Sequence, residues 1–267
     1  MASKLLKAEH PYIKIGGPAI TSPWSDMMEP FFAYVKETGA PLDFFSWHGY
    51  LHMPGQIRGA SEKVEACLNK YGFENTESIF DEWNYVVHWG DDIQKSLDLH
   101  TGPLCAAFMT STMTVLQDSR TDKSFYYDAQ FPGAIWNGLF ERGKMLRHGE
   151  PRPIYKLKPF YALKAWHLLD ELGEQVKAAT DDADVFPTAA CDGKTLRLLV
   201  TSYNDDAGFG ESCPETKTFA LDLGGVAVKD AIIQRIDAEH DFGEEPFDGK
   251  TFTLPGNSFA LLTLTLA

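Results

Sequence analysis

A carboxylate flanked by aromatic and amide side chains is the part of this sequence best suited to chemistry. The β-prone run 78–85 predicts a strand with Glu82 at its mouth, followed directly by Trp83, Asn84 and Tyr85. A carboxylate so placed can attack or stabilise a cationic anomeric carbon, and aromatic faces can hold a sugar ring. The same residues also fit a surface glutamate just past the end of a strand, so the rest of the chain must decide.

The composition describes a globular protein that acts on a neutral ligand. The 267 residues are 44% hydrophobic and 13% aromatic, enough for one or two good cores. The formal net charge is -14, and no cluster of Lys or Arg interrupts it. This balance disfavours nucleic acid and anionic membranes as partners.

Neither a membrane segment nor a cofactor site is indicated. No apolar run approaches the length of about 20 residues that a membrane span needs, and the first seven residues are too short and too charged for a signal peptide. We therefore expect a cytoplasmic location for the chain as given. The four cysteines form no CxxC pair, so we expect reduced thiols and neither a metal nor an organic cofactor. His88 and His100 lack a third ligand at metal spacing and are interpreted as surface residues.

Strand and helix patterns alternate through about residue 170. After an N-terminal helix over 2–9, the expected strands are 12–19, 42–50, 78–85 and 124–130. The expected helices are 25–38, 61–70 with Ser61 as N-cap, 102–117 and 158–172. Such alternation predicts a parallel sheet with right-handed crossovers, of about four βα units.

Polar residues gather where these strands end. Ligands of such folds meet the carboxyl ends of the strands. The candidates there are His48, Tyr50, Glu82, Asn84, Asp128 and Gln130. Tyr50, Trp83, Trp89 and Trp136 fit either sugar platforms or core residues, and we expect only one or two of the tryptophans to be platforms.

The sequence pattern changes after an acidic linker at 180–184. Short β-patterned runs separated by turns follow, at 196–203, 217–223, 231–236 and 259–266. We predict two domains, a partial barrel over residues 1–178 and a small antiparallel β-sandwich over 179–267. The second domain carries no obvious chemistry, which favours an accessory role.

Three ordered segments resemble a known family. Residues 12–19, 42–50 and 81–84 look like strands five, six and seven of the (β/α)8 barrel of glycoside hydrolase family 39, which includes β-xylosidases and α-L-iduronidases. Residues 138–140 and 158–163 are similar to its last helical region, and the C-terminal part is similar to its accessory β-sandwich. The fold expected is therefore α/β, a partial (half) TIM-type (β/α) barrel followed by a β-sandwich.

The resemblance implies a retaining glycosidase with Glu82 as the nucleophile and His48 in contact with the sugar. The family's acid/base glutamate, in an Asn-Glu-Pro motif after strand four, has no match, because the chain begins in what resembles helix four. Met28-Glu29-Pro30 is a tempting substitute. Glu29 opens a predicted helix, however, and we interpret it as a partner of the helix dipole rather than a catalyst.

A half barrel leaves strand edges uncovered, and two hypotheses follow. Two copies related by a two-fold axis would supply eight strands, and Asp128 of the partner subunit would then approach Glu82 as the acid. Carboxyl groups about 5–5.5 Å apart imply retention, and about 6.5–9.5 Å implies inversion. The alternative is a degenerate relative that binds carbohydrate, or serves as a scaffold, without turnover. The first hypothesis gives a β-xylosidase-like hydrolase of β-linked sugars, with Tyr50, Asn84, Gln130 and the tryptophans binding substrate.

Overall fold

The computed structural model describes residues 2–129, 135–141 and 155–267. The chain forms two compact units, which are described separately. The first unit comprises Met1–Asn84 and Val115–Tyr127, and the second comprises Tyr85–Thr114 and Asp128–Ala267. The predicted domain boundary at residue 178 stays a prediction.

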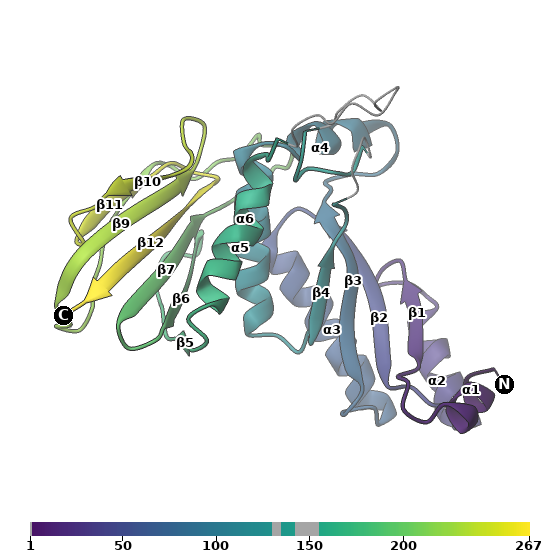
Figure 1. Ribbon diagram of the computed structural model, residues 1–267. Coiled ribbons are helices and arrows are strands. Elements are labelled where there is room, and N and C mark those ends of the chain that lie inside the picture. Colours follow the sequence, from purple (N-terminus) through teal and green to yellow (C-terminus); the bar gives the residue numbers. More distant parts are fainter. Residues whose placement is uncertain (1, 130–134, 142–154) are drawn as a thin grey trace, which may run out of the picture. The chain divides into compact units, whose positions relative to one another are not determined.

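The first unit contains a four-stranded sheet in the order β1-β2-β3-β4 (Figure 1). Its strands are β1 (Gly16–Ile20), β2 (Phe44–Leu51), β3 (Glu77–Tyr85) and β4 (Lys123–Tyr126). The pairs β1–β2 and β3–β4 are parallel. The helices of this unit are α1 (Ala2–Glu9), α2 (Met28–Thr38) and α3 (Pro54–Tyr71). Between β3 and β4 the sequence also forms η1 (Gly90–Asp92), α4 (Ile93–Leu99) and α5 (Pro103–Gln117), which belong to the second unit except for the last turn of α5. This is the predicted partial (β/α) barrel.

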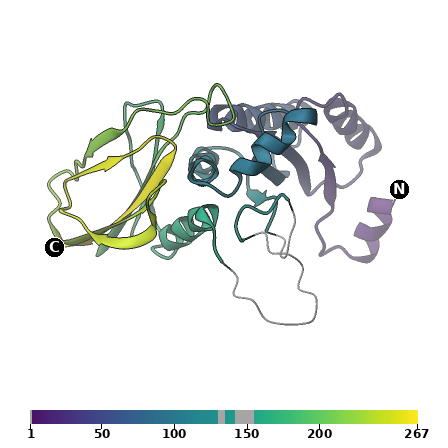
Figure 2. The ribbon, with the colours of Figure 1, turned by 90° about the horizontal axis from the view of Figure 1, so that it is seen from above.

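Helices α2 and α3 lie on one face of this sheet, seen from above in purple and blue in Figure 2. Phe32 of α2 packs on Phe45 of β2 with ring centroids 4.6 Å apart. Two residues along β2, Trp47 stacks on Phe80 of β3 at 4.0 Å. Gly49 leaves room for that ring, because a Cβ atom there would meet Phe80 at 3.0 Å. Alternate residues of β2 therefore build the core, and Ser46, His48 and Tyr50 occupy the opposite face.

Between two of its pairs with β4, strand β3 contains one extra residue. Phe80 pairs with Ser124 and Trp83 with Tyr126, so three steps along β3 match two along β4. An extra residue of this kind is a β-bulge, and it reverses the alternation of faces. Ser78 and Phe80 face the core before the bulge, and Trp83 and Tyr85 are buried after it.

Several predicted boundaries were wrong. The first strand begins at Gly16, and Tyr12 is exposed. Helix α3 begins at Pro54 rather than at Ser61, because proline suits the first turn and the Gln56 side chain accepts the backbone N–H groups of His52 and Met53. The fourth strand ends at Tyr126, so Asp128 lies beyond it. The helices predicted at 2–9, 102–117 and 158–172 are confirmed to within two residues.

The second unit contains the predicted β-sandwich. A six-stranded sheet has the order β10-β9-β12-β7-β6-β5, and a two-stranded sheet is formed by β11 and β8. Buried Val200, Ile233 and Leu262 of the larger sheet belong to one core with Phe252 and Leu254 of the smaller. The bounds are α6 (Lys158–Asp170), β5 (Gln175–Val176), β6 (Val185–Cys191), β7 (Thr195–Ser202), β8 (Lys217–Ala220), β9 (Val228–Ile236), β10 (Asp241–Pro246), β11 (Thr251–Leu254) and β12 (Ser258–Leu266).

Strands β6, β10 and β11 were not predicted from the sequence. Pro187 within β6 and the charged, Pro-ended β10 weaken the strand pattern. Pro187 is tolerated because β5 pairs with β6 only at Ala189 and Ala190, so no strand of the described residues pairs with Pro187 on that side. The charges of β10 are tolerated because β10 is an edge strand. No helix in the parts of the chain that the structure describes is long and apolar enough to cross a membrane.

Replacing Trp47 by Phe is expected to lower the free energy of unfolding by about 1–3 kcal/mol, because the change removes ring contacts with Phe80 and the 3.1 Å hydrogen bond from Nε1 to Ser78 Oγ. Urea unfolding followed by circular dichroism measures the change. The matched control is Trp24→Phe, at an exposed tryptophan of the same unit, with an expected change within about 0.5 kcal/mol. Equal effects of the two variants would contradict this account of the core.

Candidate functional site

Polar side chains from β2 and β3 meet on the sheet face opposite the core. Tyr50 Oη donates a 2.7 Å hydrogen bond to Glu82 Oε2, and His48 Nδ1 lies 3.3 Å from the same oxygen. The other ring nitrogen, His48 Nε2, lies 3.4 Å from Asp81 Oδ1. We call Ser46, His48, Tyr50, Asp81 and Glu82 the polar ladder. The structure thus brings His48, Tyr50 and Glu82 together, as the sequence predicted.

The two strands contribute to the ladder in different ways. Ser46, His48 and Tyr50 share a face of β2 because they are two residues apart. Asp81 and Glu82 are consecutive and would face opposite ways in a regular strand, but the bulge turns both toward His48. Sequence periodicity therefore missed Asp81.

Ser46 links the ladder to β1. The pairing of β1 with β2 also shifts, between Pro18 and Ile20, and the intervening Ala19 N–H donates to Ser46 Oγ at 2.9 Å. Since Ser46 Oγ accepts that bond, its own proton is available to the Asp81 carboxyl group, to which it is hydrogen-bonded. The end of the ladder at Ser46 is buried.

Accessibility and charge differ between the two carboxyl groups. Burial raises the pKa of Asp81 above its ordinary value; the His48 charge and the Ser46 hydrogen bond oppose this shift, and the Glu82 charge adds to it. The Glu82 side chain is 34% exposed, against 27% for Asp81 and 15% for His48. Glu82 is thus the member of this trio most open to a ligand.

The residues that follow Glu82 are buried. The Trp83 side chain is 1% exposed and meets Tyr126 edge-on, with centroids 5.3 Å apart. Asn84 is fully buried, and its Nδ2 donates a 2.6 Å bond to the carbonyl oxygen of Tyr127. Asn84 therefore joins the end of β3 to the segment after β4. The roles of both residues in binding sugar stay predictions.

The second unit holds the remaining candidates. Trp89 is 59% exposed, and its ring lies 5.9 Å from that of Trp136 at 44°. Trp136 is also 5.9 Å from His100. A sugar platform requires an exposed aromatic side chain, and Trp89 meets that requirement. Asp128 is buried, and Gln130 lies outside the described residues.

The sequence analysis interpreted both His88 and His100 as surface residues. His88 is exposed, but for His100 that interpretation was wrong. His100 is fully buried, with Nε2 2.7 Å from the carbonyl oxygen of Tyr85. A short polar contact to the backbone compensates its burial. Among the described residues, no group of three or more His, Cys, Asp or Glu side chains could hold a metal ion.

A buried tyrosine–aspartate pair lies at the end of β3. Tyr85 Oη donates to Asp205 Oδ2 and accepts the N–H of Phe209 at 2.8 Å. Asp205, fully buried, also accepts the N–H of Gly210 at 2.9 Å. Asp205 falls between the β-patterned runs 196–203 and 217–223, and nothing local in the sequence shows that it meets a distant phenol. The pair fixes the loop after β7.

Glu29 lies in the first turn of α2, as predicted. Its Oε2 accepts hydrogen bonds from Lys70 Nζ at 2.6 Å and from Tyr71 Oη at 3.2 Å. The carboxylate is thus engaged with the C-terminal end of α3.

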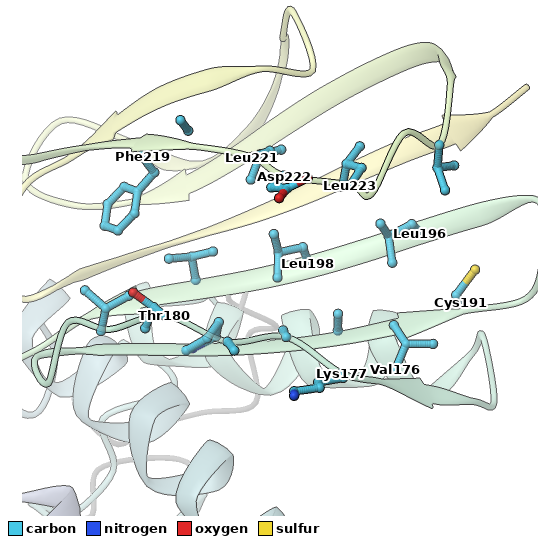
Figure 3. Close-up of a pocket in the computed structure, with 18 of the residues that line it drawn as sticks. Val176, Lys177, Thr180, Cys191, Leu196, Leu198, Phe219, Leu221, Asp222 and Leu223 are labelled. Atoms are coloured by element: carbon cyan, nitrogen blue, oxygen red, sulfur yellow. The ribbon is translucent and has the colours of Figure 1, made fainter.

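The β-sandwich has an apolar cleft of ≈ 500 Å³ (Figure 3). Leu196 and Leu198 of β7 line one side, and Phe219 and Leu221 line the other. The two-stranded sheet is narrower than the six-stranded one, which leaves this part of the larger sheet uncovered. The cleft lacks paired carboxyl groups, so its lining does not suggest glycoside hydrolysis.

The fold is that of known glycosidases. A glucosidase from Croceicoccus marinus superposes with a TM-score of 0.67 at 21% identity, covering 99% of this chain and 63% of its own. A monomeric β-xylosidase from Caulobacter crescentus gives 0.65 at 16%, covering 98% and 63%. A glycoside hydrolase family 39 enzyme from Xanthomonas axonopodis pv. citri gives 0.64 at 16%, covering 99% and 62%.

This chain spans about three fifths of the length of those proteins. No protein-family model and no curated protein sequence matches it. At such identities the likeness concerns the fold, and the chemistry must be argued from the residues.

Replacing Tyr85 by Phe is expected to weaken the loss of stability at high pH. Burial, together with the hydrogen bond to Asp205, raises the pKa of Tyr85, so above about pH 10 the folded state keeps a proton that the unfolded state releases. The free energy of unfolding therefore falls as pH rises, and less steeply in the variant. Burial also raises the pKa of Tyr203, which keeps part of the slope. Urea unfolding between about pH 9 and pH 11 measures both slopes; equal slopes would contradict the assignment.

Proposed function

We propose that this chain is a glycoside hydrolase of the retaining, β-xylosidase-like type, with Glu82 as the nucleophile. The observation that carries the proposal concerns one oxygen of Glu82. Tyr50 Oη donates a hydrogen bond to Oε2 and His48 Nδ1 lies 3.3 Å from it, while the side chain remains accessible. Oε1 is then the oxygen available to an anomeric carbon. A glycosidase fold supports this function.

The reaction needs two steps. Glu82 attacks the anomeric carbon as the bond to the leaving oxygen breaks, and a general acid gives that oxygen a proton. Water then attacks the anomeric carbon of this glycosyl ester and loses its proton to the same group, now acting as a base. The bond from the anomeric carbon to the Glu82 oxygen breaks, and Glu82 is released. The substrate we propose is a neutral saccharide, in keeping with the net charge of -14.

The second carboxyl group is proposed to come from another copy of the chain. Strands β1 and β4 are the outer strands of the four-stranded sheet in the described part of the chain, and both edges offer backbone groups for pairing. A two-fold dimer that pairs β1 with β4 of the other copy would close eight strands. Asp128 of the partner subunit, two residues beyond β4, would then serve as acid/base toward Glu82.

A specific observation also favours a second function. The Asn-Glu-Pro motif that the resemblance links with the acid/base does not occur in the sequence given. Without a general acid, turnover of poor leaving groups falls by about 10²–10⁴-fold. The alternative is therefore a carbohydrate-binding protein without turnover, in which the polar ladder holds sugar.

Replacing Glu82 by Gln is expected to lower kcat/KM for 4-nitrophenyl β-xyloside by about 10³-fold or more, because an amide cannot form the glycosyl ester. Steady-state hydrolysis by the purified chain measures the effect. Glu77→Gln is the matched control, since Glu77 lies on the same strand but pairs with Lys14 and Lys123 outside the ladder. A 2-deoxy-2-fluoro xyloside should also leave a covalent adduct that mass spectrometry locates on Glu82. Hydrolysis unaffected by the change, or an adduct elsewhere, would end the assignment.

Mixing two inactive variants tests the shared site. If Glu82 of one copy works with Asp128 of the other, a Glu82→Gln subunit and an Asp128→Asn subunit form one intact site together. Equal mixing after dissociation should restore about a quarter of wild-type activity, since half of the dimers are mixed and one of their two sites is intact. Sedimentation velocity checks that dimers form. A monomer, or a mixed dimer without restored activity, would refute the shared site.

A further inference from the structure

We propose that Asp81 is a positioning residue for Glu82 that acts through His48: its carboxyl group shares a proton with His48 Nε2, while His48 Nδ1–H donates to Glu82. The inference rests on the proposed role of Glu82 as nucleophile, but its physical content concerns only protons on three neighbouring side chains.

The geometry places one imidazole between two consecutive carboxyl groups. His48 Nε2 faces Asp81 Oδ1 at 3.4 Å, and His48 Nδ1 faces Glu82 Oε2 at 3.3 Å. Asp81 Oδ1 is buried and accepts no hydrogen bond of standard geometry, and the imidazole lies 3.4 Å from it. This arrangement depends on the bulge, which turns both carboxyl groups to the same face.

Counting protons selects the possible states. A neutral imidazole has one N–H, and its other nitrogen presents a lone pair. A lone pair facing a carboxylate oxygen is repulsive, so one of the three groups must carry an extra proton. A proton on Glu82 would leave Asp81, the more buried carboxyl group, charged, and burial disfavours that state. Two favourable states remain. Either His48 is an imidazolium between two carboxylates, or Asp81 is protonated and donates to Nε2 while Nδ1–H donates to Glu82. In both states Nδ1 carries the proton.

Two observations fit this control by Asp81. Burial opposes the charged form of its carboxyl group, and the charged groups that act on it are His48 from β2 and Glu82 from β3. Ser46, also on β2, holds the carboxyl group in place through its hydroxyl. Asp81 can thus share a proton with His48 at little electrostatic cost.

The arrangement also balances charge during the proposed reaction. In either state Asp81 and His48 together have no net charge, and Glu82 carries the single negative charge. When Glu82 forms an ester with the sugar, that charge is neutralised, and the Asp81–His48 pair needs no proton from solvent. Without Asp81, an imidazolium beside the ester would be left as an uncompensated charge.

Nitrogen-15 spectra of the imidazole at pH 7 test the inference without requiring activity. We expect His48 Nδ1 to be protonated in the wild type, with its signal identified by its loss in His48→Phe. Asp81→Leu should shift the Nε2 signal, because the proton shared with Asp81 is lost, while Nδ1 keeps its proton toward Glu82; Glu77→Gln should leave both signals unchanged. If Asp81→Leu does not fold by circular dichroism, Asp81→Ala replaces it. An unprotonated Nδ1 in the wild type, or an Nε2 signal unchanged by the loss of Asp81, would overturn the inference.

A double-mutant cycle adds the catalytic readout. Asp81→Leu should lower kcat by about 10²-fold with a smaller change in KM, since a misplaced nucleophile affects the chemical step. In the His48→Phe background the same change should have no further effect, because Asp81 acts through His48. Additive losses would contradict the inference. An inactive wild type with the expected spectra would refute the proposed function and leave the role of Asp81 standing.

Discussion

The side chains of a β-strand alternate between two faces, and the extra residue of β3 between Phe80 and Trp83 reverses that alternation within one strand. Before the bulge, Phe80 completes the stack with Trp47 in the core. After it, Trp83 and Tyr85 continue the buried side. Between them, Asp81 and Glu82 both turn to the polar face, so the core and the ladder depend on the same irregularity.

The polar ladder is a compact electrostatic system. Five side chains from two strands hold two carboxyl groups, one imidazole and two hydroxyl groups, and only the Glu82 end is substantially open. The ladder therefore combines a buried end, where Ser46 fixes Asp81, with an accessible end, where Tyr50 orients Glu82. A nucleophile needs this combination of a buried support and an accessible end, because a rigid support limits the positions of the reacting oxygen.

Much of the architecture could be predicted from local patterns. The strand around Glu82, the helices near 102–117 and 158–172 and the terminal sandwich follow from periodicity and turn residues. The start of α3 could not be predicted, since the Gln56 side chain accepts the N–H of Met53 only once the turn has formed. Asp81 was missed because strict alternation assigns it and Glu82 to different faces, and Asp205 because its phenol partner is distant in sequence.

The irregularity in β3 also bears on how such a site arises. A substitution changes one side chain, whereas deleting one residue between Phe80 and Trp83 removes the bulge itself. Two steps along β3 would then match two along β4, so Trp83 and Tyr85 would keep the buried side and only one residue before Trp83 would reach the polar face. Sequences related to this one should therefore vary in residue type at these positions far more readily than in length.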